Sequence, residues 1–262
     1  MAHTGDNVSP RPATQAGSDD ADLQAGISDL AGLVADSMAL PDLLAEVATF
    51  AARTIPGADG VGVALLQTDR SKVVVTGSAT SAPVVDQIDR LQYDTLHEGP
   101  SLTAASERCT VRSGSLGGEK RWPRFGPRVG RLGIHSVLAL PLLVSDRVIG
   151  AISVYGRGKD IFDEQSVELG ELFAKPAAVA VHNAHILAQA IALTVQLQTA
   201  LATRPVIDQA IGLIRGRTGR SADESFAQLK AISQADHRKV AEVAQQVVDE
   251  AVRRARARLT GA

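Results

Sequence analysis

The segment from Leu197 to Val248 is the feature that most constrains how this chain can fold. Its apolar residues recur three or four positions apart in three successive runs, which is the spacing of amphipathic helices. Between Arg204 and Arg258 there are 11 Arg or Lys against 7 Asp or Glu, a net charge of +4, whereas the rest of the chain has 16 basic and 22 acidic residues, net −6. The segment therefore predicts three short helices with a positive surface, where a polyanion would bind.

Local signals indicate where these helices begin. The first is predicted to restart at Pro205 as a continuation of the helix before it. Ser221 and Glu224 have the spacing of a capping box, which begins the second helix, and the third is predicted to begin near His237. Gly212 lies inside the first helix, where glycine costs about 1 kcal/mol relative to alanine. This glycine indicates either close helix packing or the approach of a phosphate backbone.

The motifs of this segment resemble those of the ANTAR domain, a three-helix RNA-binding module of bacterial antiterminators. They read Arg-x-x-Ile-x-x-Ala-x-Gly from Arg204, Ser-x-x-Glu-Ser-Phe-x-x-Leu from Ser221 and Ser-Gln-x-x-x-x-Lys-Val-x-x-Val-Ala from Ser233. The resemblance implies that two such domains in a dimer hold RNA hairpins, whose loops expose base edges, and so prevent a terminator from forming. The candidate RNA-binding residues are Arg204, Gly212, Arg215, Arg217, His237, Arg238 and Lys239.

The first 26 residues are rich in Ser, Gly, Pro, Asp and Thr, so they are predicted to form a disordered tail. Farther along, β-branched segments at 61–66 and 72–79, and again at 136–144 and 148–155, are separated by short polar connections, which predicts two hairpins. Helical patterns precede the first hairpin and follow each of the two. This order predicts an α+β domain, an antiparallel sheet flanked by helices.

Four motifs of this region resemble the GAF domain, a small-ligand sensor module. They are EGPS at Glu98, RWPRF from Arg121, SVLALPL from Ser136, and VIGAISVYG from Val148 followed by Phe162. The resemblance implies a pocket between the sheet and the covering segment 93–122. Either this pocket holds an unidentified small molecule, or side chains fill it and the domain is purely structural. The predicted domains are a tail at 1–26, a GAF sensor at 27–185, a linking helix at 186–203 and an ANTAR domain at 204–262.

The linking helix carries Leu187, Ala190, Thr194, Leu197 and Leu201 three or four residues apart. Such a seam suits a coiled coil between two copies of the chain, although packing within its own domain explains the pattern equally well. A homodimer is expected, either through this helix or through the GAF domain.

The sequence offers little for catalysis or cofactor binding. His97, Glu98 and Ser101 are neighbours, but no nucleophile-elbow motif surrounds the serine. His182 and His185 have no further metal ligand nearby in the sequence, and Cys109 is the only cysteine, which excludes an intramolecular disulfide and a cysteine-rich zinc site. We therefore expect no enzyme activity, no cofactor and no metal.

No apolar run reaches the roughly 18 residues of a membrane helix, and the N-terminus lacks the basic and apolar regions of a signal peptide. These patterns predict no membrane contact and residence in the cytoplasm. The predicted function is that of a transcription antitermination regulator, in which a GAF sensor controls an RNA-binding ANTAR domain. The alternative is a ligand-sensing regulator whose C-terminal helical domain binds DNA or a protein partner.

Overall fold

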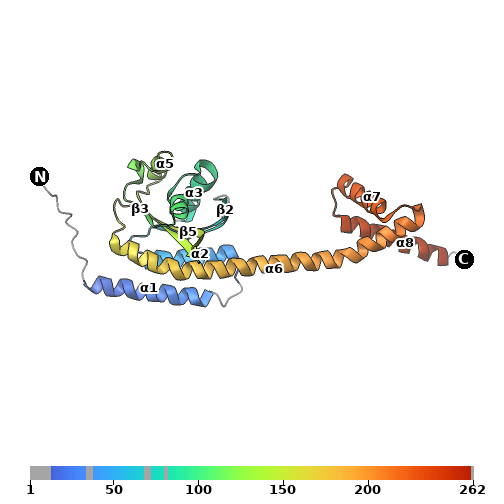
Figure 1. Ribbon diagram of the computed structural model, residues 1–262, viewed down its shortest axis with the longest axis horizontal. Helices are drawn as coiled ribbons and strands as arrows, with labels where there is room; N and C mark the ends of the chain where they lie inside the picture. The colour runs from blue at the N-terminus through green and yellow to red at the C-terminus, as the bar shows by residue number, and fades with distance from the viewer. Residues whose placement is uncertain (1–12, 34–37, 68–71, 80–81, 261–262) are drawn as a thin grey trace. The chain divides into compact units, whose positions relative to one another are not determined.

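The computed structural model describes residues 13–33, 38–67, 72–79 and 82–260 (Figure 1). The chain divides into two compact units, Met1–Ala188 and Gln189–Ala262. In chain order, the elements before the long helix are α1 (Ala13–Leu33), α2 (Leu40–Thr54), β1 (Gly60–Gln67), β2 (Lys72–Ala79), α3 (Ala82–Asp89), the π-helix η1 (Arg90–Leu96), α4 (Pro100–Glu107), β3 (Val111–Ser113), the 3₁₀-helix η2 (Leu116–Gly118), α5 (Phe125–Arg131), β4 (Ser136–Val144) and β5 (Arg147–Gly156). The remaining elements are α6 (Glu164–Thr218), α7 (Ala222–Ala235) and α8 (Val240–Thr260).

Five antiparallel strands form one sheet in the order β2-β1-β5-β4-β3. Both predicted hairpins are confirmed, since β1 pairs with β2 and β4 pairs with β5. Between β4 and β5, Ser145 and Asp146 have φ values of 45° and 62°. Two successive positive φ angles make a type I′ turn, whose twist matches that of the strands it joins. The polar connection predicted at 68–71 lies outside the described residues.

Side chains alternate between the two faces of the sheet, and helices cover both faces. Leu138, Leu140 and Leu142 of β4 pack in one apolar cluster with residues of α2 and α6. Val137 and Ala139 of the same strand pack in a second cluster with residues of α3, α4 and α5. Figure 1 shows α2 and α6 on one side of the sheet and α3 and α5 on the other. The predicted α+β class is confirmed.

The predicted disordered tail is wrong for residues 13–26, which belong to helix α1. Leu23 and Leu30 are buried in the cluster that α2 and α6 share, and Ile27 packs against it. These three residues are three and four positions apart, so they form one apolar stripe that a count of composition does not detect. Gly26 allows α1 to approach α2 closely, because a Cβ at this position would lie 2.6 Å from Thr54 Oγ1. Residues 1–12 lie outside the described residues.

Helix α6 continues through Pro205, so the predicted restart of the helix at that residue is wrong. A proline inside a helix removes one backbone hydrogen bond. Burial of Ala210 and Ile214 in the following turns offsets that loss.

By length and composition alone, α6 could also cross a membrane, and it is the only such helix in the described residues. A search for an uninterrupted apolar run misses it, because His, Asn, Gln and Thr residues interrupt the run. One helix of this kind is weak support for a membrane span, since core helices of soluble proteins pass the same test.

The second unit has a small core made by the C-terminal end of α6 with α7 and α8. Its buried apolar residues are Ala210, Ile214, Leu229, Val243 and Ala244. The predicted capping box begins α7: the Ser221 hydroxyl accepts from the Glu224 N–H at 3.2 Å, and the Glu224 carboxylate accepts from the Ser221 N–H at 2.8 Å. This prediction is confirmed.

The third helix, α8, begins at Val240, so its predicted start near His237 is wrong. His237 has a φ of 51°, and the Arg238 N–H donates to the Ser233 carbonyl at 3.0 Å. This left-handed residue followed by a bond back to α7 is a Schellman motif, which ends a helix. Arg238 and Lys239 therefore lie in the connection between α7 and α8 and not in the first turn of α8.

We predict that Ser221→Ala lowers the local stability of α7 by about 1 kcal/mol, because the Glu224 N–H loses its acceptor. Hydrogen exchange of the amides of α7 in the full chain measures this as roughly fivefold faster exchange. Ser221→Thr is the matched control, since threonine retains the capping hydroxyl and should restore most of the protection. Unchanged exchange in the alanine variant would contradict the role assigned to the cap.

Candidate functional site

The candidate RNA-binding residues of α6 lie on two sides of the helix. Arg204, Gly212 and Arg215 follow one another at spacings that place them on one exposed face, away from the buried Ala210 and Ile214. Arg217 is also exposed, but it lies toward the other flank of the helix. A Cβ built on Gly212 has no atom within 4 Å. Among the described residues, no helix packs against this glycine, so the packing explanation finds no support within the chain.

The other three candidates, His237, Arg238 and Lys239, are consecutive and exposed in the connection between α7 and α8. The Arg238 side chain contacts two residues of α8. Its guanidinium donates to Gln246 Oε1 at 2.7 Å and lies 3.7 Å from a carboxylate oxygen of Glu242. Lys239 has no ion pair with any described residue. The structure thus brings these three side chains into one turn, with Lys239 as the cation least engaged by the protein itself.

The charges of the candidate arginines on α6 are only weakly neutralised within the chain. Arg204 lies 4.0 Å from Asp208, and both side chains are mostly exposed, so this pair contributes little stability. Arg215 and Arg217 have no ion pair within the described part of the chain. Cations that are exposed and unpaired bind a phosphate without first breaking a salt bridge.

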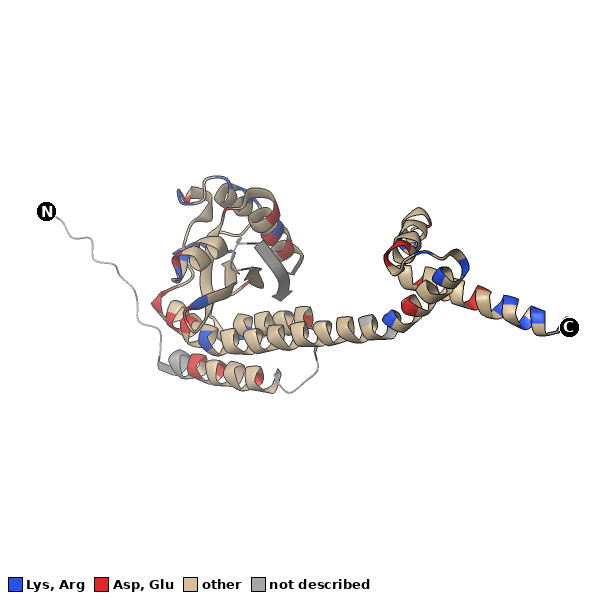
Figure 2. Cartoon of the chain, turned by 45° about the vertical axis from the view of Figure 1, so that its right-hand side comes forward, with Lys and Arg blue, Asp and Glu red and all other residues tan. Residues whose placement is uncertain are grey.

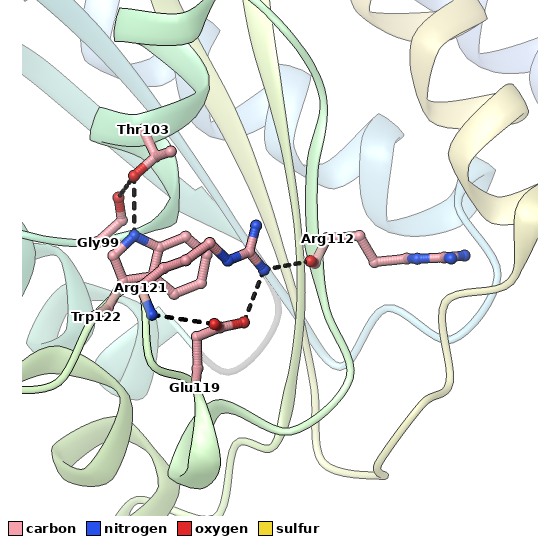
Figure 3. Close-up of polar contacts among 6 residues, drawn as sticks. All are labelled: Gly99, Thr103, Arg112, Glu119, Arg121 and Trp122. Carbon is pink, nitrogen blue, oxygen red and sulfur yellow. Dashed lines mark hydrogen bonds and ion pairs between the residues drawn. The ribbon is translucent and has the colours of Figure 1, made fainter.

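In the first unit, an open pocket of about 440 Å³ is lined by His97, Glu98, Gly99, Leu102, Thr103, Ser106, Arg121 and Trp122. Figure 3 shows how its wall is fixed: Trp122 Nε1 donates to Thr103 Oγ1 at 2.9 Å, and the Arg121 guanidinium lies 4.6 Å from the centre of the indole ring. Arg121 also donates to Glu119 and to the Arg112 carbonyl, each at 2.7 Å. The hydrogen bond from Arg121 lowers the pKa of Glu119 to about 2. The arginine is thus locked in the pocket wall with its charge balanced.

The three neighbours considered for catalysis are separated by the fold. Glu98 accepts hydrogen bonds from the Arg124 and Phe125 N–H groups at 2.8 and 3.0 Å and so binds the first turn of α5. Partial burial raises the pKa of Glu98, but these hydrogen bonds outweigh it and the pKa falls below its ordinary value. Ser101 is fully buried, whereas His97 is exposed with a φ of 51°. The arrangement contains no hydrogen bond from a serine to a base.

A buried polar cluster lies between the sheet and the helices of its second face. It consists of Asp89, Gln92, Tyr93, Ser101, Ser153 and Tyr155, from α3, η1, α4 and β5. Gln92 Oε1 accepts from the Ser101 N–H at 3.0 Å, and the Ser101 and Ser153 hydroxyls are hydrogen-bonded. Gln92 Nε2 and the Tyr155 hydroxyl complete no hydrogen bond of good geometry among the described residues, although the Ser101 and Ser153 hydroxyls lie near enough to Tyr155 to lower its pKa. Buried polar atoms without partners are costly, so this cluster is suited to a ligand that supplies the missing bonds.

Two further features support a binding role for the cluster. Gln92 and Tyr93 belong to a π-helix, a rare conformation that is frequent at functional sites. Gly62 of β1 lies under α3, where a Cβ would come within 2.9 Å of Val85 Cγ1 and 3.3 Å of Asp89 Oδ2. Burial, together with the nearby carboxylates of Asp86 and Asp94, raises the pKa of Asp89 from 3.8 to about 7. Burial also raises the pKa of both tyrosines.

These six residues were not predicted as a site from the sequence. Asp89 and Gln92 follow Val85 and Ile88 at the spacing of a buried helix face, and polar residues in such positions are the signal that could have found the cluster. Tyr93 and Ser101 do fall in the segment 93–122 that was expected to cover a pocket. No group of three or more metal-ligating side chains occurs in the described residues, and Cys109 is exposed.

Comparison with family models gives two matches. The GAF domain model matches residues 37–182, and the ANTAR domain model matches residues 195–248. The first match spans more than half of the chain, and the two matches follow one another in the order inferred from the motifs.

Solved structures resemble the first unit at low sequence identity. The GAF domain of a phosphoenolpyruvate-protein phosphotransferase from Coxiella burnetii is 16% identical with a TM-score of 0.47, over 67% of this chain and 98% of that one. Free methionine-R-sulfoxide reductase from Neisseria meningitidis is 16% identical with a TM-score of 0.45, over 63% of this chain and 91% of that one. No curated protein matches the sequence significantly.

We predict that Asp89 makes the stability of the protein depend on pH. Between about pH 4 and pH 7 the folded protein keeps a proton on Asp89 that the unfolded chain releases, so the free energy of unfolding falls as the pH rises through this range. Asp89→Asn cannot ionise and should remove most of the decline. Urea unfolding of both proteins at pH 5 and pH 8 measures the difference.

The exposed Asp146→Asn variant serves as the control, because asparagine also tolerates the positive φ of this position. Its free energy of unfolding should fall with rising pH as that of the wild type does. An equal decline in Asp89→Asn would show that Asp89 is not the group responsible.

Proposed function

Because the chain belongs to the GAF domain family and carries an ANTAR domain after it, we propose that it is a transcription antitermination regulator. In this proposal, the GAF sensor controls the binding of the ANTAR domain to hairpin loops of nascent RNA. Nascent transcripts are made in the cytoplasm of a bacterium, so the proposal locates the protein there. Both domains are regulatory modules, and the proposed output is binding and not catalysis.

The observation that carries the proposal is the exposed, unpaired charge of the ANTAR domain. Arg215, Arg217 and Lys239 have no ion pair with described residues, and Gly212, on the same face of α6 as Arg215, leaves the helix surface open. Phosphate contacts supply much of the affinity of nucleic-acid-binding proteins, and a glycine lets a backbone approach a helix closely. These features suit RNA binding better than they suit packing inside the protein.

The buried polar cluster around Asp89 supports the sensor part of the proposal. A ligand that bonds to Gln92 Nε2 and the Tyr155 hydroxyl would satisfy polar atoms that otherwise lose their hydrogen bonds on folding. Such a ligand would bind the folded unit and not the unfolded chain, so it would stabilise that unit. The six residues of the cluster include no Lys, Arg or His, which favours an uncharged or cationic ligand over an anion.

We further propose that the regulator is a homodimer joined through α6. Val179, Ile186 and Leu193 are seven residues apart on this helix, and each is more than half exposed. Leu197, also more than half exposed, continues this stripe and belongs to the predicted seam as well. A heptad stripe of exposed apolar residues is the pattern by which two helices form a coiled coil.

The test of the proposed function is a binding measurement on the full chain. The probes are a pool of stem-loop RNAs with randomised loops and a DNA duplex that matches the stem. The proposal expects the RNA to bind more tightly than the duplex at physiological salt. Tighter binding to the duplex would instead favour a DNA-binding regulator, and binding to neither would overturn the RNA proposal.

We predict that Gly212→Ala separates RNA binding from stability. The open space around Gly212 admits a methyl group, so stability should hold or rise by about 0.4–1 kcal/mol, while the affinity for the stem-loop pool falls at least about tenfold. Gly32→Ala, in the equally open helix α1, is the matched control and should leave the affinity unchanged. A loss of stability, or an unchanged affinity, in Gly212→Ala would contradict contact with RNA at this position.

We predict that Leu197→Lys converts the dimer into monomers, because the interface would then bury a charge. Light scattering of the full chain measures the mass. Gln196→Lys adds the same charge at the adjacent exposed position outside the stripe and should remain dimeric. If Leu197→Lys is still a dimer, the interface lies elsewhere, and the GAF domain is then the alternative.

A further inference from the structure

Helix α8 continues beyond the part of the chain that matches the ANTAR domain. The match ends at residue 248, whereas α8 ends at Thr260. The matched residues 195–248 contain seven Arg or Lys against five Asp or Glu, a net charge of +2. Residues 251–260 contain four arginines and no acidic residue. Figure 2 shows these basic residues gathered toward the C-terminal end of α8. The highest density of positive charge in the second unit thus lies outside the matched domain.

This extension cannot continue the core of the second unit. The row of α8 that packs in the core contains Val240, Val243 and Val247, and the next positions in the same row are 251, 254 and 258. Arginines occupy two of those positions, and residues 252–259 are all exposed. The sequence therefore stops specifying a buried face just where the family match ends.

The helix dipole and local ion pairs explain only part of this charge. Only Arg258 lies in the last turn, where a cation interacts favourably with the helix dipole. Arg254 pairs with Glu250 one turn earlier. Arg253 and Arg258 have no ion pair with any described residue. These two arginines are therefore free to bind an external anion.

We propose that Arg253, Arg254, Arg256 and Arg258 form a second phosphate-binding surface, which holds the RNA backbone. The inference rests on the proposed function, because it assigns further contacts to the same RNA. The four side chains spread over about 200° of the helix circumference and about 7.5 Å along its axis. That spread suits several phosphates of a curved strand and not one small anion. Phosphate contacts position an RNA without reading its sequence.

A membrane is a poorer partner for this surface. The apolar residues on the opposite side of the extension are Val252, Ala255 and Leu259. Helices that lie in a membrane interface bury a broad apolar face, commonly with Trp, Phe and several Leu residues. Val252, Ala255 and Leu259 include no aromatic residue and only one Leu, so they offer little area to insert.

The test is the salt dependence of RNA binding by the full chain in which all four arginines are replaced by glutamine. Glutamine has nearly the same helix propensity as arginine, so α8 should remain helical, which circular dichroism checks. With the stem-loop pool as the probe, the slope of log affinity against log salt should flatten by up to about 3, since each lost phosphate contact removes roughly 0.7–0.9. At physiological salt the affinity should fall at least about tenfold, by the same factor for every loop sequence.

A control variant removes the same charge from the other unit, with Arg128, Arg131, Arg147 and Arg157 replaced by glutamine; all four are exposed. It should keep the wild-type slope. If the wild type binds RNA and the α8 variant behaves as the control does, this inference fails while the proposed function stands. If the wild type does not bind RNA, both fail. Loss of binding to phosphatidylglycerol vesicles with unchanged RNA affinity would assign the surface to membranes and overturn the inference.

Discussion

Burial of α6 against the sheet is the interaction on which the rest of the structure depends. Phe173, Ala177 and Val181 of this helix are fully buried in the cluster that also contains α1, α2 and one face of the sheet. Farther along the same helix, Ala210 and Ile214 supply two of the five apolar residues that are buried in the described part of the second unit. One helix therefore contributes to both cores. Its middle part has no core of its own and exposes apolar side chains, which accounts for the partner that we propose for it.

The second face of the sheet is governed by a different constraint. A core selected only for stability would be apolar there, because a buried carboxyl group and unpaired amide or hydroxyl groups cost free energy. Instead the chain places Asp89, Gln92 and Tyr155 beneath the helices, beside a π-helical turn. Departures from local rules concentrate where a protein carries out its function. This is the physical reason to connect the cluster with sensing, and the same burial moves the titration of Asp89 toward neutral pH.

Sequence patterns predicted the parts of the fold that depend on local periodicity. The two hairpins and the capping box at Ser221 follow from residues that are close in the chain. The patterns failed where distant contacts decide: Leu23 and Leu30 order α1 only because α2 and α6 bury them. His237 ends a helix in a conformation usually taken by glycine, so no common residue signal marked that boundary. Among the site residues, charge predicted the exposed cations, whereas the buried polar cluster became visible only in three dimensions.

The small core of the second unit bears on how RNA binding would be regulated. Five buried apolar residues, two of them alanines, stabilise a domain of this size only modestly. Any partner that binds the folded unit alone adds stability by mass action, about 2.7 kcal/mol when it is present at 100 times its dissociation constant. That gain is a large fraction of the stability of a marginal domain. Phosphate contacts made by the folded unit would therefore stabilise its fold, and a more stable fold would in turn strengthen RNA binding.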